Sequence, residues 1–173
     1  MVRPVSDAAL ATFTLEHADC VNLAQSRLFA NTRIDQIEDV LSECNVIALC
    51  AGDPLISTGE ISEALYLVLE GRINVYHGLG SAQSLQILEV GDYFGEVSLI
   101  DRQSVHATAF ADTDSRLLAI GRETFWKLIR TSHAVACNLL ATIGQRLHTH
   151  AASRSERLET GIAPNCLQLS SRG

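Results

Sequence analysis

Residues 64–76 read ALYLVLEGRINVY, and this stretch decides the class of fold. Two apolar runs, residues 65–69 and 73–76, lie on either side of Gly71. Short apolar runs that end at a glycine are typical of β-strands, and they are shorter than most helices. The stretch therefore predicts two consecutive strands.

The same alternation of short runs and breaks extends in both directions. Further strand-like runs lie at residues 46–49, 85–90, 107–110 and 116–120. Glycines stand at the strand ends, where a positive φ or a close approach of two backbones favours this residue; they are Gly52, Gly59, Gly71, Gly91 and Gly95. Short strands at this spacing favour an all-β sandwich or barrel over alternating strands and helices.

Helical periodicity flanks the β-rich region on both sides. In residues 34–41, apolar side chains recur at steps of three and four, which predicts an amphipathic helix. After Gly121, one helix is expected around Phe125 and Leu128, and a second from about residue 133 through 147 with an extension toward 158. Gly161 and Pro164 break helices, so a flexible tail is expected after them.

Composition excludes several classes of protein. The chain has 173 residues, 47% of them hydrophobic, and a formal net charge of −7. Phosphate backbones attract positive charge, so this chain is not expected to bind DNA. It has no apolar run of about 18 residues and no secretory signal, which predicts a cytoplasmic protein without a membrane partner.

Neither catalytic nor metal motifs are visible. The sequence has no GxSxG, P-loop or HExxH pattern, so no catalytic residue and no enzyme activity are predicted. Its five cysteines are scattered without a CxxC pair. Because zinc ligands cluster at short, recognisable spacings, no metal site and no cysteine chemistry are predicted.

Four blocks of sequence, taken in order, resemble the cyclic nucleotide-binding domain family, as in the sensory domain of catabolite activator protein-like regulators. They are GDPLISTGE (52–60), ALYLVLEGRINVY (64–76, similar to a hairpin of the family), GDYFGEVSLI (91–100), and SRLLAI (115–120) followed by FWKL (125–128). The resemblance implies a mainly β fold: a double-stranded β-helix (jelly roll) barrel with an N-terminal helix and C-terminal helices. It also implies three segments, residues 1–27, 28–150 and 151–173, and leaves too few residues for a DNA-binding domain.

The third block resembles the start of the family's phosphate-binding cassette. By resemblance, the ligand-binding residues would include Phe94, Gly95, Glu96, Val97 and Ser98. Glu96 would accept a hydrogen bond from the ribose 2′-hydroxyl, and the backbone amides of residues 95–98 would hold the cyclic phosphate. The alternative is a solvated Glu96 at the rim of the barrel with no ligand.

The cassette of the family continues with a loop that reads like Pro-Arg-Ala-Ala-Thr, whose arginine neutralises the phosphate. Aligned without gaps, this chain has Ser104, Val105, His106, Ala107 and Thr108, so valine stands at the arginine position. A charge-assisted contact to phosphate contributes roughly 1.5–3 kcal/mol, or about one to two decades of affinity. His106 or Arg102 could compensate, although both are also ordinary surface residues.

The C-terminal helix is the last feature. Leu140, Ile143 and Leu147 recur at steps of three and four, as in a homodimer seam, but the same spacing suits a helix packed on its own barrel. By resemblance, Arg146 and His150 would face the base of the ligand.

Three functions stay open. The first is a stand-alone regulatory or sensory module that binds cAMP or another cyclic nucleotide, needs no cofactor and acts on a signalling partner. The second is a degenerate domain of the same fold that serves as a protein-interaction scaffold. The third is a module for a different anionic ligand, such as a cyclic dinucleotide. Val105 favours the second and third, and the retained Phe94, Gly95 and Glu96 favour the first.

Overall fold

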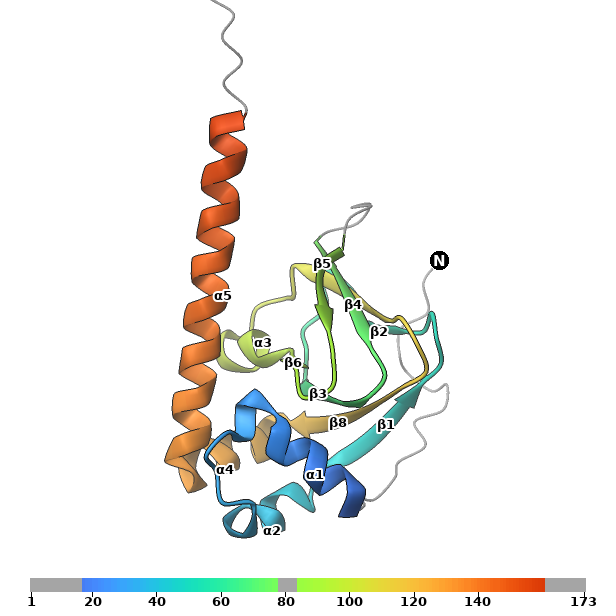
Figure 1. The fold of residues 1–173 in the computed structure, drawn as a ribbon, viewed down its shortest axis with the longest axis vertical. Helices are drawn as coiled ribbons and strands as arrows, with labels where there is room; N and C mark the ends of the chain where they lie inside the picture. Colours follow the sequence, from blue (N-terminus) through green and yellow to red (C-terminus); the bar gives the residue numbers. More distant parts are fainter. Residues whose placement is uncertain (1–16, 78–83, 161–173) are drawn as a thin grey trace, which may run out of the picture. The chain divides into compact units, whose positions relative to one another are not determined.

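The computed structural model describes residues 17–77 and 84–160. Eight strands form two four-stranded sheets in which all neighbours are antiparallel (Figure 1). The first sheet has the order β1 (Asn45–Leu49), β8 (Ser115–Gly121), β3 (Ala64–Glu70), β6 (Tyr93–Phe94). The second has the order β2 (Pro54–Ile56), β7 (Ala107–Ala111), β4 (Ile73–His77), β5 (Ser84–Leu88). The predicted mainly β jelly-roll fold is confirmed, as two sheets and not as one closed barrel.

An apolar cluster that draws on both sheets forms the core. Val68 and Leu117 come from the first sheet, and Ile73 and Val75 come from the second; all four are buried. Alternate residues of a strand point to opposite faces. Leu65, Leu67 and Leu69 of β3 are nevertheless all fully buried as well, because helices pack against this strand. This explains the continuous apolar run of residues 65–69.

Strands β3 and β4 do not form the hairpin that the resemblance suggested. β3 pairs with β6 and β8, whereas β4 pairs with β5 and β7, so the chain crosses from one sheet to the other at Gly71. Gly71 has φ +83, and a Cβ there would overlap Ser115 and the carbonyl of Asp114. Two sheets stacked face to face require such crossings, and only glycine fits at this one.

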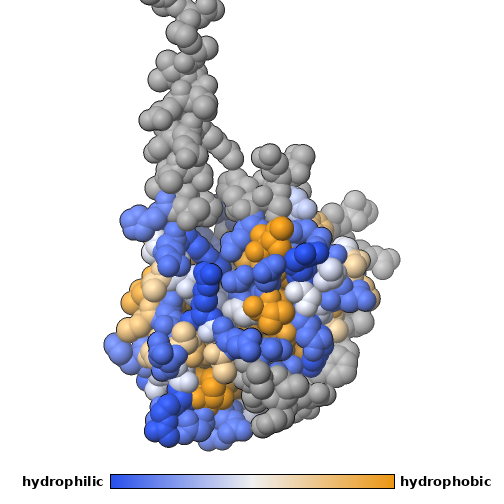
Figure 2. All heavy atoms as spheres, viewed as in Figure 1, coloured by the Kyte–Doolittle hydropathy of each residue, from blue (hydrophilic) through white to orange (hydrophobic). Residues whose placement is uncertain are grey.

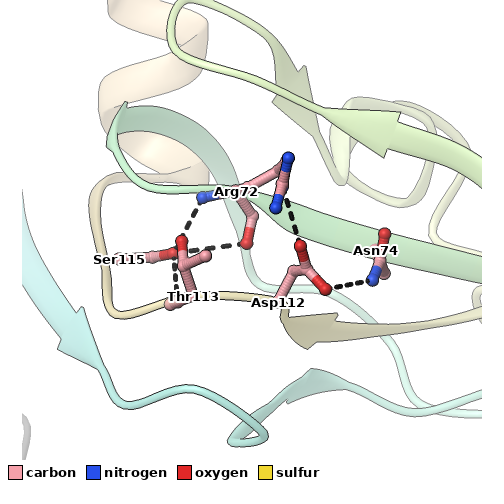
Figure 3. Close-up of polar contacts among 5 residues, drawn as sticks. All are labelled: Arg72, Asn74, Asp112, Thr113 and Ser115. Atoms are coloured by element: carbon pink, nitrogen blue, oxygen red, sulfur yellow. Dashed lines mark hydrogen bonds and ion pairs between the residues drawn. The ribbon is translucent and has the colours of Figure 1, made fainter.

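The β7–β8 crossing lies beside the β3–β4 crossing, and polar contacts join the two (Figure 3). The Arg72 guanidinium donates to Asp112 at 2.7 Å, and the Asn74 amide donates to the same carboxylate at 2.8 Å. The backbone amide of Arg72 donates to the Ser115 hydroxyl at 3.1 Å. These contacts join the β3–β4 crossing to the β7–β8 crossing.

Helices flank the sheets. They are α1 (His17–Gln25), η1 (Arg27–Phe29), η2 (Ile34–Gln36), α2 (Glu38–Leu41), α3 (Glu96–Asp101), α4 (Arg122–Thr131) and α5 (His133–Thr160). The prediction of one helix over residues 34–41 is wrong. Ile37 is fully buried with φ −119 and ψ 3, outside the helical region, and it separates η2 from α2. The expected single helix is therefore interrupted at Ile37, whose β-branched side chain has only a modest helix propensity.

The chain separates into two units, Met1–Asn138 and Leu139–Gly173. The first contains both sheets, and the described part of the second is the continuation of α5. The expected tail after Gly161 lies outside the described residues. Of the helices that the structure describes, none combines the length and apolar character required to cross a bilayer.

Candidate functional site

The candidate site is built around the short helix α3. Strand β6 ends at Phe94, and Gly95 turns the chain into the helix with φ +96. A Cβ at Gly95 would lie 2.6 Å from the carbonyl oxygen of Ala64, at the start of β3. Both the left-handed conformation and this close approach require glycine. The fold alone therefore accounts for Gly95, whatever ligand the site takes.

Hydrogen bonds hold α3 against its surroundings. The buried Ser98 hydroxyl accepts from the backbone amide of Ser62 at 3.0 Å and donates to the carbonyl of Gln103 at 2.7 Å. At the carboxyl end, the Arg122 guanidinium of α4 donates to the carbonyl of Leu99 at 2.7 Å. This hydrogen bond links α3 to α4. The position of the guanidinium is also favourable for the dipole of α3, because it lies near the C-terminus of that helix.

Glu96 lies in the first turn of α3 and is fully buried, with 0% of its surface exposed. It is therefore not a solvated residue at the rim of the sheets. A carboxylate in the first turn of a helix is favourable for the helix dipole. The next residue, Val97, is half exposed instead. The single turn thus directs Glu96 inward and Val97 outward.

Tyr66 and Phe94 are register partners on β3 and β6, and both side chains pack against the core cluster. Burial, and then the nearby Glu63 and Glu60, raise the pKa of Tyr66 above its ordinary value. The phenol therefore stays protonated at neutral pH and keeps its hydrogen-bond donor.

Residues 104–108, which follow α3 in the chain, are the segment that the resemblance aligns with the rest of the cassette. The Val105 amide donates to the carbonyl of Glu60 at 2.8 Å, and the Gly59 amide donates to the carbonyl of Val105 at 2.9 Å. The Val105 side chain packs against the core cluster, as does Ala107. At the position where the family resemblance places an arginine, an apolar side chain is in contact with other apolar side chains.

Thr108 is buried and ties this segment to the loop after β2. Its hydroxyl accepts from the backbone amide of Thr58 at 3.1 Å and lies 3.0 Å from the Thr58 hydroxyl. His106, between Val105 and Ala107, is exposed. Arg102 ends α3 with φ +59 and is exposed as well. Their compensating roles stay predictions.

The sequence predicts residues 94–98 and 104–108 as site stretches, but several contacts of these stretches are not visible in it. Ser62, Thr58 and Arg122 contact the site from other elements, and no local pattern marks them. Arg146 lies on α5 in the second unit, and the side chain of His150 lies outside the described residues, so their base-facing roles stay predictions. Among the residues that the structure describes, no three His, Cys, Asp or Glu side chains gather as metal ligands.

Comparison with known proteins decides the family. The model for the cyclic nucleotide-binding domain matches residues 46–132, which include both sheets and α3. The chain belongs to the cyclic nucleotide-binding domain family. The match contains Glu96 and the whole of residues 104–108, so Val105 lies inside the family's domain and not beside it.

Individual relatives agree with this assignment. The chain is 36% identical over 124 residues to the cyclic AMP receptor protein of Thermus thermophilus. This aligned region covers 70% of this chain and 57% of that relative. The crystal structure of the Thermus thermophilus catabolite activator protein superposes with a TM-score of 0.69 at 34% identity, over 78% of this chain and 63% of that one. An N-terminal domain of a transcriptional regulator from Streptomyces coelicolor superposes with a TM-score of 0.60 at 27% identity, over 76% of this chain and 93% of that one.

Proposed function

We propose that the protein is a regulatory module of the cyclic nucleotide-binding domain family, in which a ligand bound at α3 controls the C-terminal helix or a dimer interface. The proposal rests on Glu96, which lies in the first turn of α3 and is fully buried. In this proposal Glu96 accepts a hydrogen bond from a ribose 2′-hydroxyl, and the amides of residues 95–98 bind the phosphate.

The route from ligand to output begins at Arg122. Its guanidinium bonds to the last turn of α3, and it stands in the first turn of α4, which is followed directly by α5. If α3 can take two placements, a ligand that binds one placement more tightly than the other shifts the equilibrium toward it. Arg122 would carry that shift to the C-terminal helices, the proposed homodimer seam and a signalling partner.

Val105 limits the affinity of this module. Its side chain is an uncharged hydrocarbon that packs against the core cluster, so it offers the phosphate no charge. We expect cAMP or cGMP to bind about one to two decades more weakly than with an arginine there. The same observation favours a second candidate, a degenerate domain that binds no nucleotide and acts as a protein-interaction scaffold.

Calorimetric titration of the full chain with cAMP, cGMP and a cyclic dinucleotide tests the proposal. Binding heat that disappears in Glu96→Ala supports it. Glu63→Ala is the matched control, because Glu63 is an exposed glutamate next to Ser62 and its loss should leave the heat unchanged. Absence of heat for every ligand at millimolar concentration would contradict the sensory function and favour the scaffold. Heat for the cyclic dinucleotide alone would assign the site to a different anionic ligand.

A further inference from the structure

The first turns of α5 present two different faces. On one face, Val135 is buried and the Asn138 amide donates to the carbonyls of Leu28 and Ala30, at 3.0 and 2.7 Å. His133 and Cys137 lie on the opposite face, and both are exposed. The Cys137 sulfur lies 3.4 Å from Nε2 of His133. Residues four apart on a helix are neighbours, so this pair is held by the helix itself.

Thiolate sulfur and imidazole nitrogen are the ligands that zinc prefers in proteins, and a structural zinc site is tetrahedral with four of them. His133 and Cys137 supply two. As noted above, the described part of the chain gathers no third histidine, cysteine or acidic residue beside them. One copy of the chain therefore offers half of a site.

The spacing along α5 indicates where the other half lies. Cys137, Leu140, Gly144 and Leu147 follow one another at steps of three, four and three, the spacing of a coiled-coil seam. Leu140 and Leu147 are 69% and 66% exposed, and a Cβ on Gly144 would meet nothing within 4 Å. This helix face is apolar, regular and open.

The residues beside the seam favour a second copy of the same chain as its partner. The flanking positions 136, 141, 143 and 148 hold Ala, Ala, Ile and His, with no permanent charge among them. Two identical helices can therefore lie side by side without repulsion between like charges. A parallel two-fold pair places each residue opposite the same residue of its partner, so the two copies of Cys137 meet.

We propose that His133 and Cys137 of two copies together form a Cys2His2 site for a divalent ion of the zinc class at the start of α5. Each copy contributes one thiolate and one neutral imidazole, and binding releases the two thiol protons. The site takes one ion per two chains. The bound ion stabilises the dimer, because its four ligands come from both copies. The inference rests on the homodimer of the proposed function.

Cobalt is the probe, because Co²⁺ replaces Zn²⁺ and absorbs light in a tetrahedral thiolate site. The full chain, treated with EDTA and kept reduced with a phosphine, is titrated with CoCl2. We expect thiolate-to-cobalt and tetrahedral ligand-field bands that saturate at one Co²⁺ per two chains and vanish on addition of Zn²⁺. Cys137→Ser and His133→Ala should each abolish these bands. Cys50→Ser is the matched control, because Cys50 is also exposed and free.

Absence of a thiolate band, a band that survives Cys137→Ser, or saturation at one Co²⁺ per chain would each overturn the proposal. Light scattering on the same samples separates it from the proposed function. A metal-free dimer without cobalt bands overturns the site and leaves the seam intact, whereas a monomer that dimerises with cobalt supports the site. A monomer under both conditions overturns both the site and the seam, and the calorimetric result for nucleotides stands independently.

Discussion

At the scale of single residues, Val105 is the position at which the proposed site departs most from the family resemblance. Its backbone pairs with Gly59 and Glu60, and its side chain packs against the core cluster. A cassette that relies on backbone amides and Glu96 alone has donors for a phosphate but no opposite charge. In the proposed site, phosphate would therefore be bound with weaker electrostatics than in a cassette that carries an arginine.

Val105→Arg should restore that charge. We expect the affinity for cAMP to rise by roughly 10- to 100-fold, which corresponds to about 1.5–3 kcal/mol for a charge-assisted contact to phosphate. Calorimetry measures the change, and circular dichroism checks that the fold is kept. Val105→Gln is the uncharged control of similar length. Equal affinity in both variants would show that residue 105 does not face the phosphate.

Gly71 is the residue on which the crossing between the sheets depends. Gly71→Ala adds a Cβ that overlaps Ser115 in a backbone with positive φ, so we expect the free energy of unfolding to fall by about 2–4 kcal/mol. Gly52→Ala is the control, because Gly52 has φ +90 but open space around it, and it should cost only about 1 kcal/mol. Urea unfolding of both variants tests the difference. Equal losses would contradict the steric explanation.

At the scale of elements, the N-terminal helix α1 is attached to the first sheet by a cluster of charges. The Arg116 guanidinium of β8 lies 3.2 Å from the carboxylate of Asp19, which is 1% exposed, and 2.7 Å from that of Glu70. The hydrogen bond to Glu70, and then the charge of Asp19, raise the pKa of Arg116. This cluster connects residues 97 positions apart in the chain.

Removal of Arg116 should be costly, because it leaves the buried Asp19 carboxylate without its guanidinium. For Arg116→Met we expect a loss of roughly 3 kcal/mol in the free energy of unfolding, near the lower limit for a broken buried ion pair. Arg72→Met is the control, because Arg72 forms its ion pair with Asp112 at the surface and such pairs contribute about 0–1 kcal/mol. Chemical denaturation compares them, and a loss for Arg116→Met no larger than the control would refute the role of the cluster.

The elements also show where local patterns succeed and fail. Six strands were predicted within a few residues of their observed bounds, because each alternates or is continuously apolar over at least four positions. Strands β2 and β6 were missed, because three and two residues are too few to show a period. The prediction of one helix over residues 34–41 was wrong, because apolar spacing does not reveal that the backbone leaves the helical region at Ile37.

At the scale of the whole molecule, the proposal requires a homodimer. Apolar residues scattered over a mainly hydrophilic face are ordinary for a globular protein (Figure 2), so they do not by themselves mark an interface. Leu140 and Leu147 differ from such residues because they repeat at heptad spacing on one helix.

Leu140→Asp combined with Leu147→Asp should therefore give a monomer. Light scattering is expected to report twice 18.7 kDa for the unchanged chain and 18.7 kDa for the double variant at the same concentration. Gln145→Asp, at an exposed position outside the seam, is the control and should remain dimeric. A parent chain that is monomeric both with and without cobalt, or a dimeric double variant, would contradict the seam.

Glycine positions and short apolar runs are local features, so the sequence alone is enough to predict the family, the mainly β fold and the stretch that holds the candidate site. Local features also located Val105 at the arginine position. The three-dimensional structure was needed to show that Glu96 is buried, that β3 and β4 belong to different sheets, and that Ser62 and Arg122 contact α3. These depend on contacts between residues 23 to 36 positions apart or on the stacking of the sheets. Such contacts follow from how strands pair and sheets stack. The periodicity of a single segment therefore does not predict them.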